Sequence, residues 1–221
     1  MSTYTFRRVT AFNVPNVLTI NNSSTSTIRY GSIERTQQTV MFGNQTWTVF
    51  NCIRNHRKED VIWIDDMPVD SWETRDQFTL YLNARQNLLV AQGPSKVVKG
   101  LLDRANKVCD EIDITALHFN FDTIAGRLAN VQQAWVSVNE AGLTSVGYMG
   151  TRVRDKEEVQ TAIAQHHASY LGTVIDIDGI GRAMGFSQKG AIILINANQP
   201  MSELEKLNLA FTTYRHVTEA G

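Results

Sequence analysis

The sequence predicts a mixed α+β protein in which strands outnumber helices. Short runs of β-branched and aromatic residues recur along the chain, and many of them alternate with polar residues. An amphipathic helix is predicted over residues 95–112, where apolar side chains recur at spacings of three and four. A hairpin followed by a helix is also predicted twice, at residues 78–112 and 135–166. Together these patterns indicate strands and helices that pack on each other within one or two domains.

The first part of the chain is predicted to be mostly strand. Residues 4–14 alternate loosely between apolar and polar side chains. Residues 38–52 predict a hairpin, because Gly43-Asn44 is a favourable two-residue turn between two apolar runs. The charged run at residues 55–60 predicts a loop.

The next predicted elements lead to the amphipathic helix. Residues 61–64 predict a strand that ends in a turn at Asp65-Asp66, and residues 72–76 predict a helical turn. Residues 78–91 predict a second hairpin. Ser95 follows a proline and is a favourable N-cap for the helix after it.

The second half repeats strands and helices in a recognisable order. The predicted elements are a strand at 116–121, a helix at 123–131, strands at 135–139 and 143–149, a helix capped by Asp155 and Glu158, and a strand at 173–178. This βαββαβ order resembles the ferredoxin-like fold, which hosts many unrelated functions. Two further short strands are predicted to form a β-meander with the last strand, and a terminal helix capped by Ser202 and Glu205 follows.

The predicted architecture therefore has two halves. Residues 1–112 form a strand-rich α+β half that ends in the amphipathic helix. Residues 113–221 form the ferredoxin-like half with its added β-meander and terminal helix. The two halves are either separate domains or one continuous domain.

Composition excludes several functional classes. The net charge is −1, so no global positive field attracts nucleic acid, and any such contact must come from a local patch. Cys52 and Cys109 lack metal-site spacing, which predicts reduced thiols. No secretory signal is visible and no segment approaches the ~20 apolar residues of a membrane span, so we expect a cytoplasmic protein without a membrane partner.

Basic residues form three local groups. Each group is most simply a solvated surface, but a groove that follows phosphates becomes plausible if the groups converge in space. The candidate nucleic-acid-binding residues are Arg57 and Lys58 beside Arg54, then Lys96, Lys99, Arg104 and Lys107 on the predicted helix, and finally Arg152 and Arg154 beside Lys156.

The segment at residues 171–196 allows several interpretations. LGTVIDIDG resembles the signature of the LAGLIDADG homing endonucleases and agrees with it at Leu171, Ile175, Asp176, Asp178 and Gly179. That resemblance implies a helix in which Asp178 binds the catalytic metal. The β-branched residues at 173–175 instead favour a strand.

The glycines of the same segment suggest a second resemblance. GIGRAMGF, residues 179–186, resembles the glycine-rich loop of CRISPR RNA-processing and RNA-binding proteins with repeated ferredoxin-like domains. A third interpretation needs no family, because the glycines also suit the turns of a three-stranded meander.

A metal site is a further hypothesis for this strand. Side chains alternate along a strand, so Asp176 and Asp178 share one face. In a ferredoxin-like sheet the fourth strand lies beside the first, which would bring His118 to the same face. Two carboxylates and an imidazole could bind a divalent cation or carry out acid–base chemistry, which makes these three residues the catalytic candidates. The alternative is a polar sheet face without a ligand.

Three functional hypotheses follow from these observations. The leading one is a non-catalytic binding or assembly subunit of a cytoplasmic prokaryotic or phage complex, such as one in phage defence, which self-associates or binds a protein partner through exposed strand edges. The second is a nucleic-acid-binding protein that uses the basic groups. The third is a metal-dependent nuclease or phosphodiesterase that uses Asp176 and Asp178.

Overall fold

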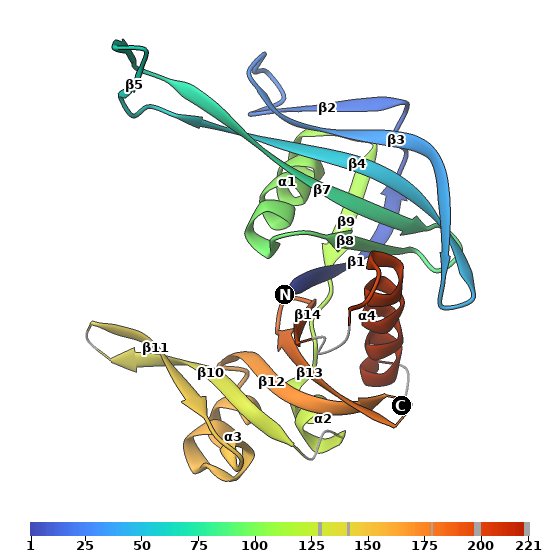
Figure 1. Ribbon diagram of the computed structural model, residues 1–221, viewed down its shortest axis with the longest axis vertical. Helices are drawn as coiled ribbons and strands as arrows, with labels where there is room; N and C mark the ends of the chain where they lie inside the picture. Colours follow the sequence, from blue (N-terminus) through green and yellow to red (C-terminus); the bar gives the residue numbers. More distant parts are fainter. Residues whose placement is uncertain (128–129, 141, 178, 197–199, 219–221) are drawn as a thin grey trace. The chain divides into compact units, whose positions relative to one another are not determined.

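The computed structural model describes residues 1–127, 130–140, 142–177, 179–196 and 200–218. These residues form a mixed α+β structure that is rich in antiparallel strands, as the sequence predicts (Figure 1). No described helix is long and apolar enough to cross a membrane. By its contacts the chain divides into unit 1, residues 1–6, 42–44 and 116–221, and unit 2, residues 7–41 and 45–115.

Unit 2 is a sheet with one helix against it. Its strand order is β1-β8-β7-β4-β3-β2, and β9 also pairs with β1. The strands are β1 (Ser2–Phe12, whose first residues belong to unit 1), β2 (Val17–Asn21), β3 (Arg29–Phe42), β4 (Gln45–Lys58), β7 (Trp72–Asn83), β8 (Leu88–Gln92) and β9 (Ile112–Ala116).

The helix of unit 2, α1 (Ser95–Val108), packs on the core through its apolar stripe. The buried residues Val98, Leu101, Leu102 and Ala105 confirm the predicted face.

The predicted ends of this helix are wrong. Ser95 is the first helical residue and its side chain makes no capping bond, because Pro94 occupies the N-cap and its carbonyl accepts hydrogen bonds from the amides of Val97 and Val98. The helix ends at Val108, and Ile112 already begins β9.

The hairpin of β3 and β4 turns at Gly43-Asn44, as predicted. Both residues have a φ of 56°, the left-handed conformation that this kind of turn requires. The charged run after it is not the predicted loop, because β4 continues to Lys58. The predicted helical turn at residues 72–76 is the start of β7. The reason is pairing: β4 and β7 are hydrogen-bonded from Thr48↔Leu82 to Lys58↔Trp72.

A short two-stranded hairpin joins β4 to β7. Its strands are β5 (Ile62–Ile64) and β6 (Met67–Val69). The turn between them is Asp65-Asp66, as predicted, and both residues have positive φ. We call residues 59–70 the ribbon tip, since they lie at the end of the paired β4 and β7 (Figure 1).

Unit 1 is an antiparallel sheet with three helices. Its strand order is β11-β10-β12-β13-β14-β1, to which β1 contributes Ser2 to Thr5 paired with β14. The elements are α2 (Phe121–Arg127), β10 (Val131–Glu140), β11 (Leu143–Met149), the 3-10 turn η1 (Val153–Asp155), α3 (Glu157–Ala164), β12 (Ala168–Ile177), β13 (Ile180–Ser187), β14 (Ala191–Asn196) and α4 (Glu203–Thr218).

The ferredoxin-like arrangement of this half is not confirmed. The order β9-α2-β10-β11-α3-β12 is βαββαβ, but its first strand, β9, precedes the strand predicted at 116–121. The pairing differs from that of the ferredoxin-like fold, because β12 lies between β10 and β13 and β9 pairs with β1. In the meander of β12, β13 and β14, β13 pairs with the side of β12 that β10 leaves open. No place is therefore left for β9 beside β12.

The predicted helix starts of unit 1 have different outcomes. Ser202 and Glu205 form the predicted reciprocal cap, in which the Ser202 amide donates to Glu205 Oε2 at 2.7 Å. Asp155 does not cap α3, because it lies within η1 and Lys156 occupies the N-cap. Residues 117–120 are not a strand, and Asn120 Oδ1 accepts a hydrogen bond from the Thr123 amide at the start of α2.

Candidate functional site

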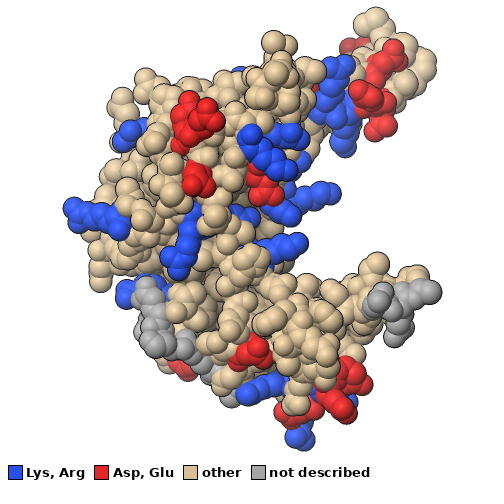
Figure 2. Space-filling view, turned by 180° about the vertical axis from the view of Figure 1, so that it is seen from behind, with Lys and Arg blue, Asp and Glu red and all other residues tan. Residues whose placement is uncertain are grey.

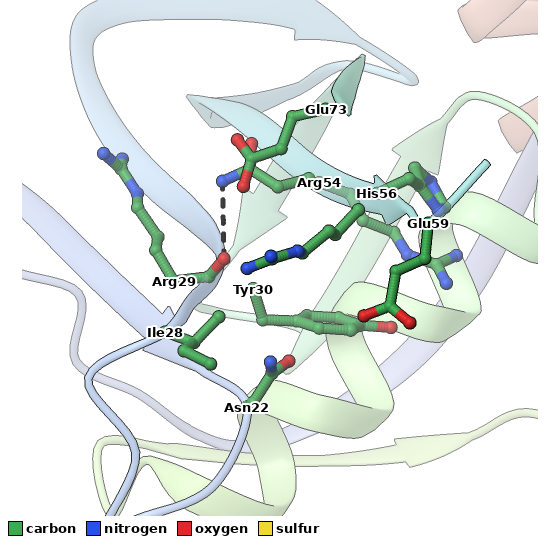
Figure 3. Close-up of a pocket in the computed structure, with 10 residues that line it drawn as sticks. Asn22, Ile28, Arg29, Tyr30, Arg54, His56, Glu59 and Glu73 are labelled. Carbon is green, nitrogen blue, oxygen red and sulfur yellow. Dashed lines mark hydrogen bonds between the residues drawn. The ribbon is translucent and has the colours of Figure 1, made fainter. Parts of the chain in front are cut away.

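A cavity of about 410 Å3 opens on unit 2 where β3 begins beside β4 (Figure 3). Its wall includes Tyr30 of β3 and four consecutive residues of β4, Arg54, Asn55, His56 and Arg57. The volume is within the range of small-molecule sites, roughly 300–1,000 Å3.

The strand geometry of β4 arranges its charged residues. Side chains alternate along a strand, so Arg54, His56 and Lys58 share one face. Across the pair, His56 Nε2 lies 2.6 Å from Asp76 Oδ2. The ammonium of Lys58 lies 4.7 Å from the centre of the Trp72 ring, within the range of a cation–π contact. Because this charged run is a strand, Arg54, His56 and Lys58 form a row of cationic or ionisable side chains on one face of β4.

Two arginines from different elements meet at the Tyr30 ring. The Arg54 Cζ lies 5.4 Å from the ring centre and the Arg104 Cζ lies 5.2 Å from it. Each guanidinium is also fixed by a backbone carbonyl: Arg54 Nη1 donates to Lys96 O at 2.9 Å, and Arg104 Nη1 donates to Asn22 O. The site thus joins β3, β4, α1 and the segment that follows β2.

The approach of Arg54 to α1 depends on a glycine. A Cβ atom at Gly100 would collide with the guanidinium of Arg54. The absence of a side chain at this position on the helix leaves the space that the guanidinium occupies.

Buried polar atoms around the site lack partners. Arg54 Nε, Asn55 Oδ1 and Trp72 Nε1 have no hydrogen-bond partner among the residues that the structure describes. Buried donors and acceptors without partners are costly, and in a native structure each one calls for an explanation. Arg54 and Asn55 line the cavity, but these two atoms are themselves buried, so they are a cost of the local packing that no contact in the described part of the chain offsets.

The local charge is mixed. Arg29 and Arg57 line the cavity together with Glu59 and Glu73, and in Figure 3 the Glu59 carboxylate points toward Tyr30. Figure 2 shows Lys and Arg side chains gathered along one part of the surface and carboxylates at the projecting end beside them.

An exposed carboxylate of α1, Asp103, acts on the charge of the buried Arg7. Burial lowers the pKa of Arg7, and the charge of Asp103 partly opposes this effect by favouring the charged guanidinium. The negative charge of Asp103 therefore stabilises the charged form of the Arg7 guanidinium.

The structure brings two of the three predicted basic groups together. Arg57, Lys58 and Arg104 lie at the cavity, at Trp72 and at Tyr30, respectively. Lys96 and Lys99 are exposed on the turn of α1 that receives Arg54, and Lys107 is exposed nearer the end of this helix.

The third basic group belongs to unit 1. Arg152 Nε pairs with Asp155 Oδ2 at 2.7 Å on an exposed surface, and Arg154 is half-buried in η1. A surface ion pair of this kind contributes little to stability, about 0–1 kcal/mol.

Sequence reasoning missed several residues of the cavity. Tyr30, Arg29 and His56 were not candidates, and neither were the two glutamates. The basic residues of the run Arg54 to Lys58 were candidates, but the run was predicted to be a loop. Its strand conformation could have been found, since a strand of the preceding hairpin leads directly into it. No local signal marks Tyr30, because its position depends on the packing of α1.

The predicted aspartate site has a different structure. The interpretation of residues 171–177 as a strand is confirmed, and the helix of the endonuclease resemblance is wrong for them. Asp176 is exposed, and its Oδ1 accepts a hydrogen bond from the Gly179 amide at 2.8 Å, which closes the turn between β12 and β13. Asp178 lies outside the described residues.

The strand pairing that would bring His118 beside Asp176 is absent from the described sheet. His118 is exposed in the irregular segment before α2. Within the described ranges, no group of three His, Cys, Asp or Glu side chains is placed to hold a metal ion. Metal binding at Asp176 and Asp178 stays a prediction.

A second cavity, of about 450 Å3, lies in unit 1 between α3 and the hairpin of β10 and β11. Its lining contains Glu157, Glu158, Tyr148 and His167 but no lysine or arginine among the described residues. It therefore lacks the charge that an anionic ligand requires.

Comparison with known proteins does not assign the chain to a family. No protein-family model matches the chain, and no curated protein sequence matches it.

Proposed function

We propose that this chain is a nucleic-acid-binding protein and that the basic surface around Tyr30 in unit 2 is its binding site. One observation carries the proposal: guanidinium groups from β4 and α1 meet at a single aromatic ring beside a cavity. Proteins that bind single-stranded nucleic acid combine cations for the phosphates with aromatic rings for the bases. Here Arg57, Lys58 and Lys99 supply exposed cations, and Tyr30 and Trp72 supply rings.

Binding is measured by fluorescence anisotropy with labelled single-stranded RNA and DNA at several salt concentrations. Contacts to phosphates release counterions, so the affinity should fall steeply as the salt concentration rises. Arg57→Gln should weaken binding about tenfold, equivalent to ~1.4 kcal/mol, and should make the salt dependence shallower.

The matched control is Arg85→Gln. Arg85 is exposed in the turn between β7 and β8, at the end of β7 opposite Trp72. Its loss removes the same charge from the same unit, so its affinity should stay near that of the wild type. Equal affinities for the two variants, or no salt-dependent binding by the wild type, would refute the proposal.

A specific surface also supports a second candidate function, that of a self-associating assembly subunit. The ribbon tip exposes Val61, Trp63, Ile64 and Met67, with 70% of Trp63 and 66% of Met67 accessible. Clustered exposed apolar side chains are typical of interaction sites. In the described strand order, β2 and β11 each have one neighbouring strand, which leaves edges for a further strand.

The tip also limits how two copies could meet. Its carboxylates include Glu59, Asp60, Asp65, Asp66 and Asp70, with no basic residue in the same segment. Two tips would therefore repel each other at neutral pH, and a tip would bind a basic surface of the second copy.

Light scattering tests this second candidate. The double variant Trp63→Ser and Met67→Ser should shift the wild-type mass to that of the monomer. Met41→Ser, which changes an equally exposed methionine on β3, should leave the mass unchanged. A wild-type monomer at high protein concentration would contradict self-association.

A further inference from the structure

The carboxylates of the Tyr30 cavity are unexpected in a site for phosphate alone. Glu59 and Glu73 line it together with Arg29 and Arg57 (Figure 3). A phosphate placed inside the cavity would be repelled by both carboxylates. A neutral group that donates hydrogen bonds fits these carboxylates without being repelled by the arginines of the same lining.

We propose that the cavity receives one unstacked base of a single-stranded nucleic acid, and that this base carries an exocyclic amino group. The inference rests on the proposed function. Glu59 and Glu73 accept hydrogen bonds from the amino group, as acidic side chains do from the amino group of cytosine. Arg29 and Arg57 hold the flanking phosphates at the rim, where they are exposed.

The wall of the cavity suits a flat heterocycle. Tyr30 and Ile28 give it an apolar side, and Ile28 is 51% exposed. Unpaired bases pack on aromatic rings and on guanidinium planes, and both are present here.

A duplex does not present such a base. Its bases are stacked, and their Watson–Crick edges are already paired, so entry into a concave site requires flipping a base out of the helix. Cytosine, adenine and guanine carry an exocyclic amino group, whereas uracil and thymine do not. The site should therefore prefer single strands over duplexes, and amino-bearing bases over uracil or thymine.

The test uses short oligouridine RNA with one central position changed to cytosine, adenine or an abasic site, and the matching oligothymidine DNA series. Affinities are measured by anisotropy at one salt concentration. Cytosine or adenine should bind several-fold more tightly than uridine or thymidine at that position, and the abasic strand most weakly. The two series also distinguish RNA from DNA as the source of the base.

Variants of the carboxylates separate recognition from general electrostatics. Glu59→Ala combined with Glu73→Ala should raise the affinity for the uridine and thymidine strands, because it removes negative charge, and should abolish the preference for cytosine and adenine. The corresponding Gln variants keep an acceptor oxygen and should retain part of the preference. Glu111→Ala, which removes an exposed carboxylate outside the cavity, should leave the preference unchanged.

The outcomes distinguish this inference from the proposed function. Binding without any preference among the bases overturns the inference and leaves nucleic-acid binding in place. So does a preference that survives both Ala substitutions, or binding of duplex that equals that of single strands. No binding to any oligonucleotide overturns both.

Discussion

At the residue scale, the site depends on one side chain and on the absence of another. Arg54 contacts Tyr30, donates a hydrogen bond to the carbonyl of Lys96 and fills the space above Gly100. Gly100 lies within α1, where glycine is unfavourable. The helix therefore sacrifices some stability at a position where a larger residue would displace a guanidinium from the site.

Gly100→Ala should weaken binding without lowering the stability of the fold. Alanine is favoured over glycine within a helix by up to ~1 kcal/mol, and the group in its way is the flexible end of Arg54, so urea unfolding should show unchanged or increased stability. Displacement of Arg54 should weaken nucleic-acid binding, measured by anisotropy. Gly126→Ala in α2, where a new Cβ meets nothing within 4 Å, is the control for helix propensity and should not affect binding. Unchanged binding by Gly100→Ala would show that the position of Arg54 is unimportant.

At the element scale, pairing partners decide the conformation of weakly biased segments. The run at residues 55–58 and the segment at 72–76 favour a loop and a helical turn, respectively, when each is considered alone. Paired with each other they are strands, in which Lys58 also contacts Trp72. The start of α4 is the opposite case, because Ser202 and Glu205 are local partners and a local pattern is sufficient.

The cap of α4 predicts a pH dependence of stability. Hydrogen bonds from the backbone amide and the hydroxyl group of Ser202 lower the pKa of Glu205 below its usual 4.5. A lowered folded-state pKa stabilises the fold above the unfolded-state pKa, and this contribution is lost as the pH falls through the folded-state value. Glu205→Gln should therefore lower the urea midpoint at pH 7 and have a much smaller effect at pH 3.

The control for this cap is Glu158→Gln. Glu158 is equally exposed in the first turn of α3, but no hydrogen bond of this kind holds it. Its substitution removes a first-turn carboxylate without removing a reciprocal cap, so the difference between its effects at the two pH values should be smaller than for Glu205→Gln. If Glu205→Gln behaves in the same way, the reciprocal cap does not contribute to the acid sensitivity.

At the scale of the whole molecule, the sequence predicts the elements better than their neighbours. The α+β class, the turn at Gly43-Asn44 and the apolar face of α1 follow from local periodicity and turn chemistry. The sheet order does not, since β12 could pair with β9 or with β13 without any change in its own alternation. Strand neighbours are determined by packing between segments that are distant in sequence. A single amino-acid sequence does not reveal this packing.

The site was predictable to a similar degree. Clustered cations were visible as runs in the sequence, and the strand alternation of Arg54, His56 and Lys58 follows once the strand is known. The convergence of Arg104 on Tyr30 required α1 to be placed against β3. The carboxylates were hidden for the same reason, because Glu73 reaches the cavity only through the pairing of β7 with β4.

The strand β1 has a consequence for how the protein is made. Its first residues pair with β14, as in Ser2↔Leu194, while its later residues belong to unit 2. During synthesis, residues Ser2 to Thr5 cannot pair with β14 until residues 191–194 have left the ribosome. Contacts between such distant segments slow folding and expose strand edges in the meantime. A nascent chain that has completed unit 2 therefore still carries unpaired backbone groups at the start of β1.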